Sequence, residues 1–400
     1  MRRVVITGLS AICSLGDDHN KIFEALCQKR VNVQRFENVN GCDLKTKVYA
    51  PLSEFDDSAF KHSLRNLKKQ GSKSSYLAAY AALKALDDSG IAVLDANTRV
   101  YVGNSAPNIN VVIDGLDDSR KGKRPNVTSV PAVMYNSAAS WVSMILQVHG
   151  PSRVVSTACS SGTDSIGMAY EDVAMGRTDM AVCGGAEYML DPELLILKGF
   201  EGLKTISKNI DGSVYSFSSE SSGFLYSEGG AAMLIIEELE HAVNRNAHIY
   251  AEITGYNSCS DAYSIISMPE DGKNSTEMLL DLIKAKKVDY YNAHSTCTKL
   301  NESVEASIIK KCFGSKENQP LINSTKSLIG HTISASGAIE AVICADSIAN
   351  GKIHGTVCKT LMEDLNVAVD TQYIDINVAV SSSFGFGGHN SALMFEKYSR

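Results

Sequence analysis

Short apolar runs bounded by polar or glycine-rich residues recur along the chain. The runs at 3–7, 179–183, 231–236 and 250–254 have the length and β-branched content of strands. Between such runs lie Ala-rich stretches of helical character, of which 74–89 is the clearest. Strands that alternate with helices in this way predict an α/β fold.

Later apolar runs each end in a polar or glycine-rich cluster. They cover 288–293, 320–323 and 378–381, and functional groups are expected at such strand ends. A further feature is the change from an apolar strand to a charged helix at "EELEH", residues 237–241. We therefore predict two α/β halves, 1–240 and 241–400, packed as one unit rather than as independent domains.

Composition narrows the classes of function. A formal net charge of −7 argues against a generally basic surface for nucleic acid. Ten cysteines without Cys-x-x-Cys or zinc-ligand spacing predict reduced thiols, no disulfide framework and no metal site. The opening "MRRVVITGLSAICSLG" fits a first strand better than a signal peptide, and no apolar run approaches the roughly 20 residues that cross a bilayer. We expect a cytoplasmic protein without a membrane span.

The stretch "STACSSG", residues 156–162, places a cysteine between a strand candidate and a helix candidate. A free cysteine is usually a small buried hydrophobe. At the start of a helix, however, the dipole favours a thiolate, so a lowered pKa is predicted for Cys159. Gly162 allows close approach of backbone or substrate. The pattern indicates that Cys159 is a nucleophile.

Two histidines in polar clusters could serve this thiol. His294 lies in "NAHSTCT" and His331 in "NSTKSLIGH", both after strand candidates. Either could instead be a hydrogen-bonded histidine without a chemical role. Lys326 could equally be solvated, or it could pair with Glu340 if the chain folds back.

The last cluster, "SSSFGFGGHN", precedes a terminal strand candidate. Its glycines could bring backbone N–H groups to a developing oxyanion. The alternative is a tight hairpin whose Phe384 and Phe386 pack in the core.

Four motifs in this order and at these separations resemble the elongating β-ketoacyl-acyl carrier protein synthases of fatty-acid and type II polyketide synthesis. They are "TACSSG", "NAHSTCT", "NSTKSLIGH" and "SSFGFGGHN", with further likeness in "RRVVITGLSAI", "GGAEYML" and "ALMFEK". The resemblance implies a thiolase-like, five-layered αβαβα fold of two related halves, normally dimeric.

The same resemblance implies the chemistry. Cys159 would take an acyl chain from the phosphopantetheine thioester of acyl carrier protein, and His294 and His331 would promote decarboxylation of malonyl-carrier. No cofactor is expected on the protein itself, because the carrier supplies the phosphopantetheine. The remaining residues that the resemblance assigns are Lys326 and Glu340 (support), Phe386 (gate, and oxyanion hole with the Cys159 N–H), Thr296 and Thr298 (pantetheine), and Phe200, Gly387 and Gly388 (substrate pocket).

Carrier docking and partners follow from the same likeness. "HSLRNLKKQGSK" carries Arg65, Lys68 and Lys69 where the family docks its acidic carrier, although a solvated helix face is the competing interpretation. A second basic cluster at 120–124 has no assignment. The partner would be a second copy or a chain-length-factor-like homologue.

Some positions depart from the family pattern. Ser295 replaces a usual glycine, Asn301 stands where an aspartate is common, and His389 replaces a usual threonine; "SSESSGFLYSEGG" lacks the arginine or basic residues often found before Gly-Phe. These changes suggest a specialised synthase, of which a polyene or polyketide ketosynthase is one candidate.

Four alternatives remain open. A non-catalytic chain-length factor would share the fold, but Cys159 argues against it. A starter-condensing synthase would have asparagine in place of the second histidine, and a thiolase would need a second cysteine in its terminal glycine loop. A cysteine hydrolase is chemically conceivable but leaves two histidines and the gate loop unexplained.

Overall fold

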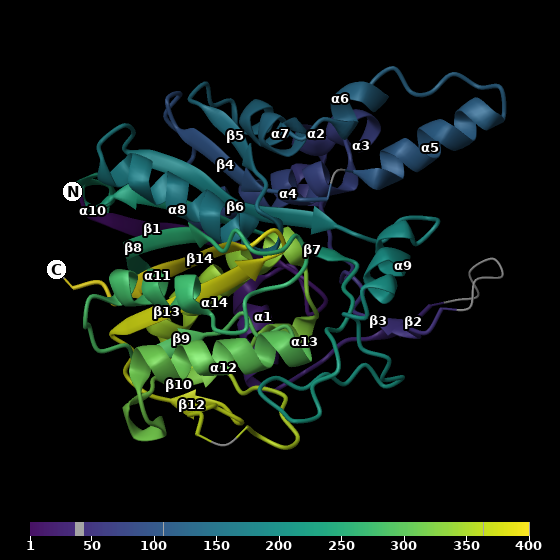
Figure 1. The fold of residues 1–400 in the computed structure, drawn as a ribbon. Coiled ribbons are helices and arrows are strands. Elements are labelled where there is room, and N and C mark those ends of the chain that lie inside the picture. Colours follow the sequence, from purple (N-terminus) through teal and green to yellow (C-terminus); the bar gives the residue numbers. More distant parts are fainter. Residues whose placement is uncertain (37–43, 107, 363, 400) are drawn as a thin grey trace.

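Two sets of five strands with the same pairing pattern make up the centre of the protein (Figure 1). The computed structural model describes residues 1–36, 44–106, 108–362 and 364–399. The first set runs in the order β5-β4-β6-β7-β1 and the second in the order β10-β9-β13-β14-β8, and they join through a short antiparallel pairing of β1 with β8. The strands of the first set are β1 (Val4–Ile12), β4 (Arg99–Gly103), β5 (Ser152–Val155), β6 (Met180–Tyr188) and β7 (Gly229–Glu238). Those of the second set are β8 (Ala251–Ser260), β9 (Tyr290–Asn292), β10 (Leu321–Asn323), β13 (Val378–Gly385) and β14 (His389–Glu396).

Strand directions repeat between the two sets. β1 pairs antiparallel with β7 and β7 with β6, whereas β6 pairs parallel with β4 and β4 with β5. In the second set β8 pairs antiparallel with β14 and β14 with β13, and β13 and β9 continue in parallel to β10. The predicted architecture of two related halves is therefore confirmed.

Helices cover both faces of each set of strands. α8 (Ser161–Ala174) and α14 (Ser336–Asn350) contribute to one core between the two sets, α4 (Lys73–Asp88) and α7 (Ser137–Leu146) cover the outer face of the first, and α11 (Lys273–Ile283) and α12 (Lys299–Phe313) cover the outer face of the second. This is the predicted αβαβα layering. It explains why β1 and β6 are buried along their whole length, rather than alternating between core and solvent.

The remaining elements are short or lie at the periphery. The helices are α1 (His19–Cys27), α2 (Lys61–Leu64), α3 (Leu67–Gln70), α5 (Ile109–Arg120), α6 (Ser129–Val133), α9 (Leu195–Gly202), α10 (Leu239–Asn244) and α13 (Lys326–Ile329). Two small ribbons pair β2 (Gln34–Arg35) with β3 (Val48–Tyr49) and β11 (Lys352–Ile353) with β12 (Gln372–Tyr373). In the described part of the chain, no helix combines the length and apolar character needed to cross a bilayer.

Close contact between α8 and the start of α14 depends on a glycine. A Cβ on Gly162 would lie 2.7 Å from the carbonyl oxygen of Ser334 and 2.8 Å from the amide nitrogen of Ala338. Any side chain there would force the two segments apart. The predicted close approach at Gly162 is thus confirmed, and it fixes the first turn of α8 against the second half.

Candidate active site

Cys159 lies in a single 3₁₀ turn, Ala158–Ser160, between β5 and α8. Ala158 has a left-handed φ of +52°, which turns the chain sharply after the strand. The hydroxyls around the cysteine secure this turn, because Ser161 Oγ donates to the Ala158 carbonyl at 2.7 Å and accepts from the Thr157 N–H at 2.9 Å. Ser160 Oγ donates to the carbonyl of His389 at 2.7 Å. The cysteine turn is therefore tied to the glycine-rich loop.

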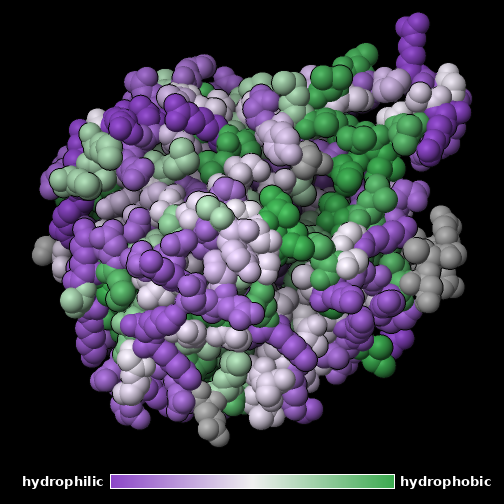
Figure 2. All heavy atoms as spheres, viewed as in Figure 1, coloured by the Kyte–Doolittle hydropathy of each residue, from purple (hydrophilic) through white to green (hydrophobic). Residues whose placement is uncertain are grey.

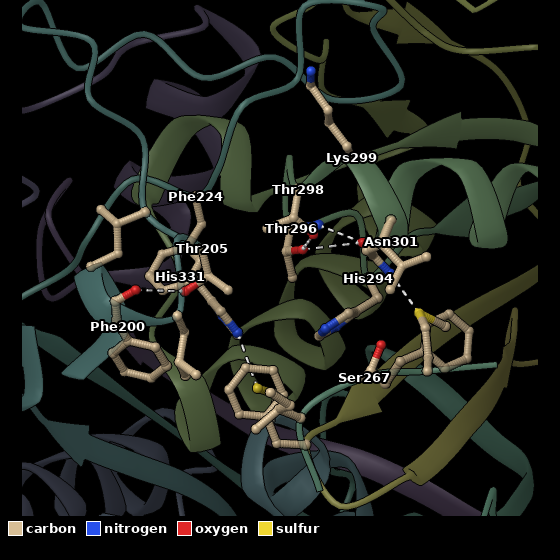
Figure 3. Close-up of a pocket in the computed structure, with 18 of the residues that line it drawn as sticks. Phe200, Thr205, Phe224, Ser267, His294, Thr296, Thr298, Lys299, Asn301 and His331 are labelled. Carbon is tan, nitrogen blue, oxygen red and sulfur yellow. Dashed lines mark hydrogen bonds between the residues drawn. The ribbon is translucent and has the colours of Figure 1, made fainter. Parts of the chain in front are cut away.

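The two histidines come from the second half and meet the sulfur in the interior. His294 follows β9, and His331 follows β10 and α13. His331 Nε2 lies 3.1 Å from Cys159 Sγ, and the sulfur and one nitrogen of each ring lie within 4.8 Å of one another (Figure 3). All three side chains are buried. The structure brings together the predicted nucleophile and both predicted partners. A thiolate and imidazoles are also the kinds of group that bind zinc.

Hydrogen bonding assigns the proton on His331. Its Nδ1 faces the Ile333 N–H at 3.4 Å and the hydroxyl of Ser336 at 3.0 Å. Because the Ile333 N–H can only donate, Nδ1 of His331 is the acceptor, and the ring proton is assigned to Nε2. The Nε2–H then points at the sulfur, where it can stabilise a thiolate or an oxyanion.

The charge states of the three groups are set by burial. Burial, together with the positive charge of Lys326, lowers the pKa of both His294 and His331 well below the usual value of histidine. Burial raises the pKa of the Cys159 thiol to about 11, although Lys326 and the backbone N–H groups of Phe386 and Cys159 oppose this. The lowered pKa predicted for Cys159 is therefore wrong. The start of the helix does supply backbone N–H groups, but desolvation of the thiolate outweighs them.

Lys326 and Glu340 form a buried ion pair beside this centre. Lys326 Nζ lies 2.6 Å from Glu340 Oε1, and each side chain is 1% exposed. Burial raises the pKa of Glu340 to about 7 in spite of the lysine. The proposed pairing is confirmed, and the alternative of a solvated Lys326 is wrong. The positive charge of Lys326 acts on both histidines and on the sulfur of Cys159.

Two buried carboxylates shape the His294 loop and escaped the sequence reasoning. Glu305 accepts the N–H groups of His294 at 2.8 Å and Ser295 at 2.6 Å. Glu302 accepts the Cys297 N–H at 2.7 Å and the Ser295 hydroxyl at 2.8 Å. The sequence feature that could have identified these two carboxylates is "NESVE", which has two glutamates three residues apart at the start of a helix.

The departures at Ser295 and Asn301 are accommodated locally. Ser295 adopts a φ of +20° and its hydroxyl bonds to a carboxylate. Asn301 Oδ1 accepts the Thr296 N–H at 2.8 Å. Asn301 therefore leaves no carboxylate missing from the loop, because the neighbouring Glu302 provides one.

A cavity of about 800 Å³ connects these groups to the surface (Figure 3). Phe200, Phe224 and Phe386 line it, with the rings of Phe200 and Phe386 6.3 Å apart. Thr296 and Thr298 also line it, and their hydroxyl oxygens are 3.0 Å apart. A long ligand with an apolar segment and amide groups fits such a wall.

The glycine-rich loop forms the hairpin considered for it, but of its two phenylalanines only Phe384 belongs to the buried core, whereas Phe386 lines the cavity. It is a tight hairpin between β13 and β14, with left-handed φ values of +83° at Gly387 and +78° at Gly388. Phe384 is buried in the core of the second half and also reaches the cavity, whereas the N–H of Phe386 faces the sulfur. Gly388 lines the cavity, while the Gly387 N–H donates to the Ile265 carbonyl at 2.9 Å.

Comparison with known proteins decides the family. The family model described as "Beta-ketoacyl synthase, N-terminal domain" matches residues 1–242, and the one described as "Beta-ketoacyl synthase, C-terminal domain" matches residues 250–359. The chain belongs to the beta-ketoacyl synthase family. The 3-oxoacyl-[acyl-carrier-protein] synthase 2 of Staphylococcus aureus (strain COL) is 32% identical, with 99% of each chain covered. The enzyme of the same name from Synechocystis sp. is 30% identical over 99% of this chain and 98% of that one.

Solved members of the family share the fold over the full length. A beta-ketoacyl synthase from Burkholderia phymatum STM815 superposes with a TM-score of 0.88 at 29% identity and covers 100% of both chains. A ketosynthase solved in complex with its type II polyketide acyl-carrier protein and bound to a hexaketide also gives 0.88, at 27% identity, and covers 99% of this chain and 100% of that one. These similarities agree with the fold and with membership of the family.

The residues predicted to dock a carrier of a beta-ketoacyl synthase lie outside the cavity. Arg65 follows α2, and Lys68 and Lys69 lie on α3, all exposed. Lys68 forms an ion pair with Asp57. Neither Arg65 nor Lys69 has an ion pair among the described residues. Two of the three charges are therefore free for an acidic partner.

We expect the two histidines of this synthase to stay neutral where an ordinary histidine titrates. Their pKa values are lowered, so acidification from about pH 8 to about pH 5.5 adds no proton to either ring, whereas a ring with a pKa near 6.5 would become mostly protonated. The check is a titration of ¹⁵N-histidine-labelled protein by NMR, which also reports the tautomer of His331. The histidine signal that disappears from the spectrum of His331→Gln is assigned to His331. A titration midpoint near pH 6.5 for either ring would contradict the expectation.

Proposed function

We propose that the chain is a β-ketoacyl-acyl carrier protein synthase, which lengthens an acyl chain by decarboxylative condensation with malonyl-carrier. The observation that carries this is the 3.1 Å contact of Cys159 Sγ with His331 Nε2, with His294 beside both in the cavity. One thiol and two neutral imidazoles suit the two half-reactions, nucleophilic transfer and decarboxylation.

In the first half-reaction the sulfur of Cys159 attacks the thioester carbonyl of acyl-carrier. A new S–C bond forms, the carrier's C–S bond breaks, and the thiol proton leaves with the carrier thiol. The Cys159 and Phe386 N–H groups face the sulfur and can donate to the tetrahedral oxyanion. Because the thiol is protonated at rest, the His331 Nε2–H and the charge of Lys326 serve to stabilise the thiolate as it forms.

In the second half-reaction malonyl-carrier loses carbon dioxide. The C–C bond electrons become an enolate, whose oxygen can accept N–H groups from His294 and His331. The enolate carbon attacks the acyl-Cys159 carbonyl, the S–C bond breaks, and the Cys159 thiolate takes up a proton from solvent. The product is a β-ketoacyl-carrier two carbons longer. Neutral imidazoles are suitable donors because they stabilise the oxyanion without giving up a full proton.

The supporting roles follow from position. Lys326, held by Glu340, supplies a fixed positive potential to the centre without lining the cavity. Thr296 and Thr298 lie where a pantetheine arm would pass. We further propose that no cofactor is resident, that the carrier brings the phosphopantetheine, and that the enzyme works in the cytoplasm, which the free thiols of the described cysteines support.

The test is intact-protein mass spectrometry after mixing the protein with a panel of saturated and polyunsaturated acyl-carrier thioesters. We expect a mass increase equal to one acyl group, and the preferred acyl group distinguishes fatty-acid from polyene or polyketide work. Absence of any acylated protein, alone or with a co-purifying homologue, would favour the alternative of a non-condensing chain-length-factor-like partner.

An exposed apolar surface supports the proposed dimer. Figure 2 shows it around the projecting α5–α6 segment, where the exposed side chains are Val112, Leu116, Val127, Val130, Met134 and Tyr135. Val127 and Val130 are 94% and 73% exposed. Apolar patches of this kind mark association surfaces, and the occupant proposed here is a second copy or a close homologue.

We expect the double variant Val130→Asp, Met134→Asp to be monomeric, because two charges cannot be desolvated within an apolar interface without large cost. Size-exclusion chromatography with light scattering measures the mass. Val93→Asp is the matched control, since Val93 is 85% exposed and lies in the loop between α4 and β4 rather than in the α5–α6 segment. A dimer that persists in the double variant would place the interface elsewhere.

A further inference from the structure

Three lysines line the cavity that leads to Cys159, and among the described residues no aspartate or glutamate does. They are Lys204, Lys208 and Lys299. This is unusual for a chain that has 45 acidic residues against 38 basic ones. A wall with positive charges alone focuses a positive potential into the space that it encloses.

None of these three ammonium groups is neutralised within the described residues. Elsewhere lysines have carboxylate partners, such as Glu340 for Lys326 and Asp370 for Lys29. In the part of the chain that the structure describes, no carboxylate oxygen lies within 4.0 Å of Lys204, Lys208 or Lys299. All three side chains are exposed. Their charges are therefore available to a ligand.

The lysines come from two elements that border the cavity. Lys204 and Lys208 follow α9, whereas Lys299 is the first residue of α12. At that position the N–H groups of the first turn add to the positive potential. The 15-residue length of α12 makes this end a full helix terminus.

The polarity of the cavity runs from the interior outward. Figure 3 shows Lys299 extending beyond Thr296 and Thr298, away from His294 and His331. The buried reacting groups thus lie at one end, the hydroxyls between, and an exposed ammonium at the other. A ligand matching this order has a thioester at its inner end, amides in its middle and an anion at its outer end.

We propose that Lys204, Lys208 and Lys299 form the binding site for the phosphate of the pantetheine arm that delivers the thioester. The inference rests on the proposed function, since that function defines which ligand enters the cavity. The phosphate is an oxyanion that several ammonium groups can contact together, and fixing it sets how far the thioester reaches toward the sulfur. The site therefore recognises the arm itself, separately from the protein that carries it.

The experiment compares two small thioesters, hexanoyl-pantetheine and hexanoyl-4′-phosphopantetheine, as acyl donors to Cys159. The measured quantity is the ratio of their second-order rate constants for loading, followed by intact mass. We expect the wild type to prefer the phosphorylated donor by roughly tenfold, a preference that salt weakens. The ratio should fall about two- to fivefold in Lys208→Gln and in Lys299→Gln, and toward one in the triple variant with Lys204→Gln.

Lys198→Gln is the matched control, because Lys198 lies on α9 and donates to the Glu193 carbonyl rather than lining the cavity. It should keep the wild-type ratio. A wild-type ratio near one, or an unchanged ratio in the triple variant, would overturn the phosphate site while leaving the synthase proposal intact. If the triple variant loses rate with acyl-carrier protein but keeps the ratio for the small donors, the lysines dock the carrier's surface instead. If neither donor nor acyl-carrier loads the wild type, the synthase proposal itself fails.

Discussion

Replacing Cys159 by alanine is expected to abolish acyl loading, with a fall of about four orders of magnitude or more in its rate. The sulfur forms the bond to the acyl group, and among the described residues no other cysteine lines the cavity. The remaining groups can bind and polarise a thioester but cannot hold the acyl chain. Intact-protein mass spectrometry with a reactive acyl-carrier thioester measures the outcome.

Two comparisons make this result specific to the active site. Cys312→Ala changes a half-buried cysteine that is outside the cavity, and it should load normally. The Cys159→Ala protein should still decarboxylate malonyl-carrier, because both histidines remain, and this activity shows that the variant is folded. Full acyl loading of Cys159→Ala would remove Cys159 from the role of nucleophile.

Much of the fold follows from local pattern. β1 and β6 begin with consecutive apolar residues, 4–6 and 180–183, because helices cover both of their faces. These short apolar runs made both segments recognisable as strands. The pairing of β1 with β8 was harder to predict from the sequence. It joins strands about 250 residues apart through three residue pairs. Strand pairing over such separations is decided by tertiary packing, which leaves no mark in either segment.

The reacting residues were predictable because each follows a strand. Cys159 follows β5, His294 follows β9 and His331 comes after β10. These strands run parallel to a neighbour within their own half, and the carboxyl ends of parallel strands gather functional groups. The close contact of the two halves at Gly162 then brings the groups from different halves into one cavity.

The electrostatics of the site were not predictable in the same way. A helix start indicated a lowered pKa for Cys159, yet complete burial reverses the direction. Glu302 and Glu305 resembled ordinary surface glutamates of a helix, but both are fully buried and hold the His294 loop. Burial is a property of the packed molecule, and for ionisable groups it decides both charge and role.

The second large effect is expected at His331. His331→Ala should lower the rate of malonyl decarboxylation by roughly 10²–10³-fold, because one of the two N–H donors to the enolate oxygen is lost. Acyl loading should fall by only about tenfold, since the lost interaction there is one hydrogen bond to the sulfur, at 3.1 Å. Backbone N–H groups that remain can still stabilise the oxyanion of that half-reaction.

His294→Ala provides the matched comparison. His294 lies beside His331, with ring centres 5.6 Å apart, but makes no hydrogen bond to the sulfur within the described residues. It should therefore lose decarboxylation to a similar extent and loading to a smaller extent than His331→Ala. Single-turnover measurement of acyl transfer, together with release of labelled carbon dioxide, separates the two half-reactions. Equal losses in both half-reactions for His331→Ala would contradict this division, because they would mean that the imidazole serves the thiolate and the enolate to the same degree.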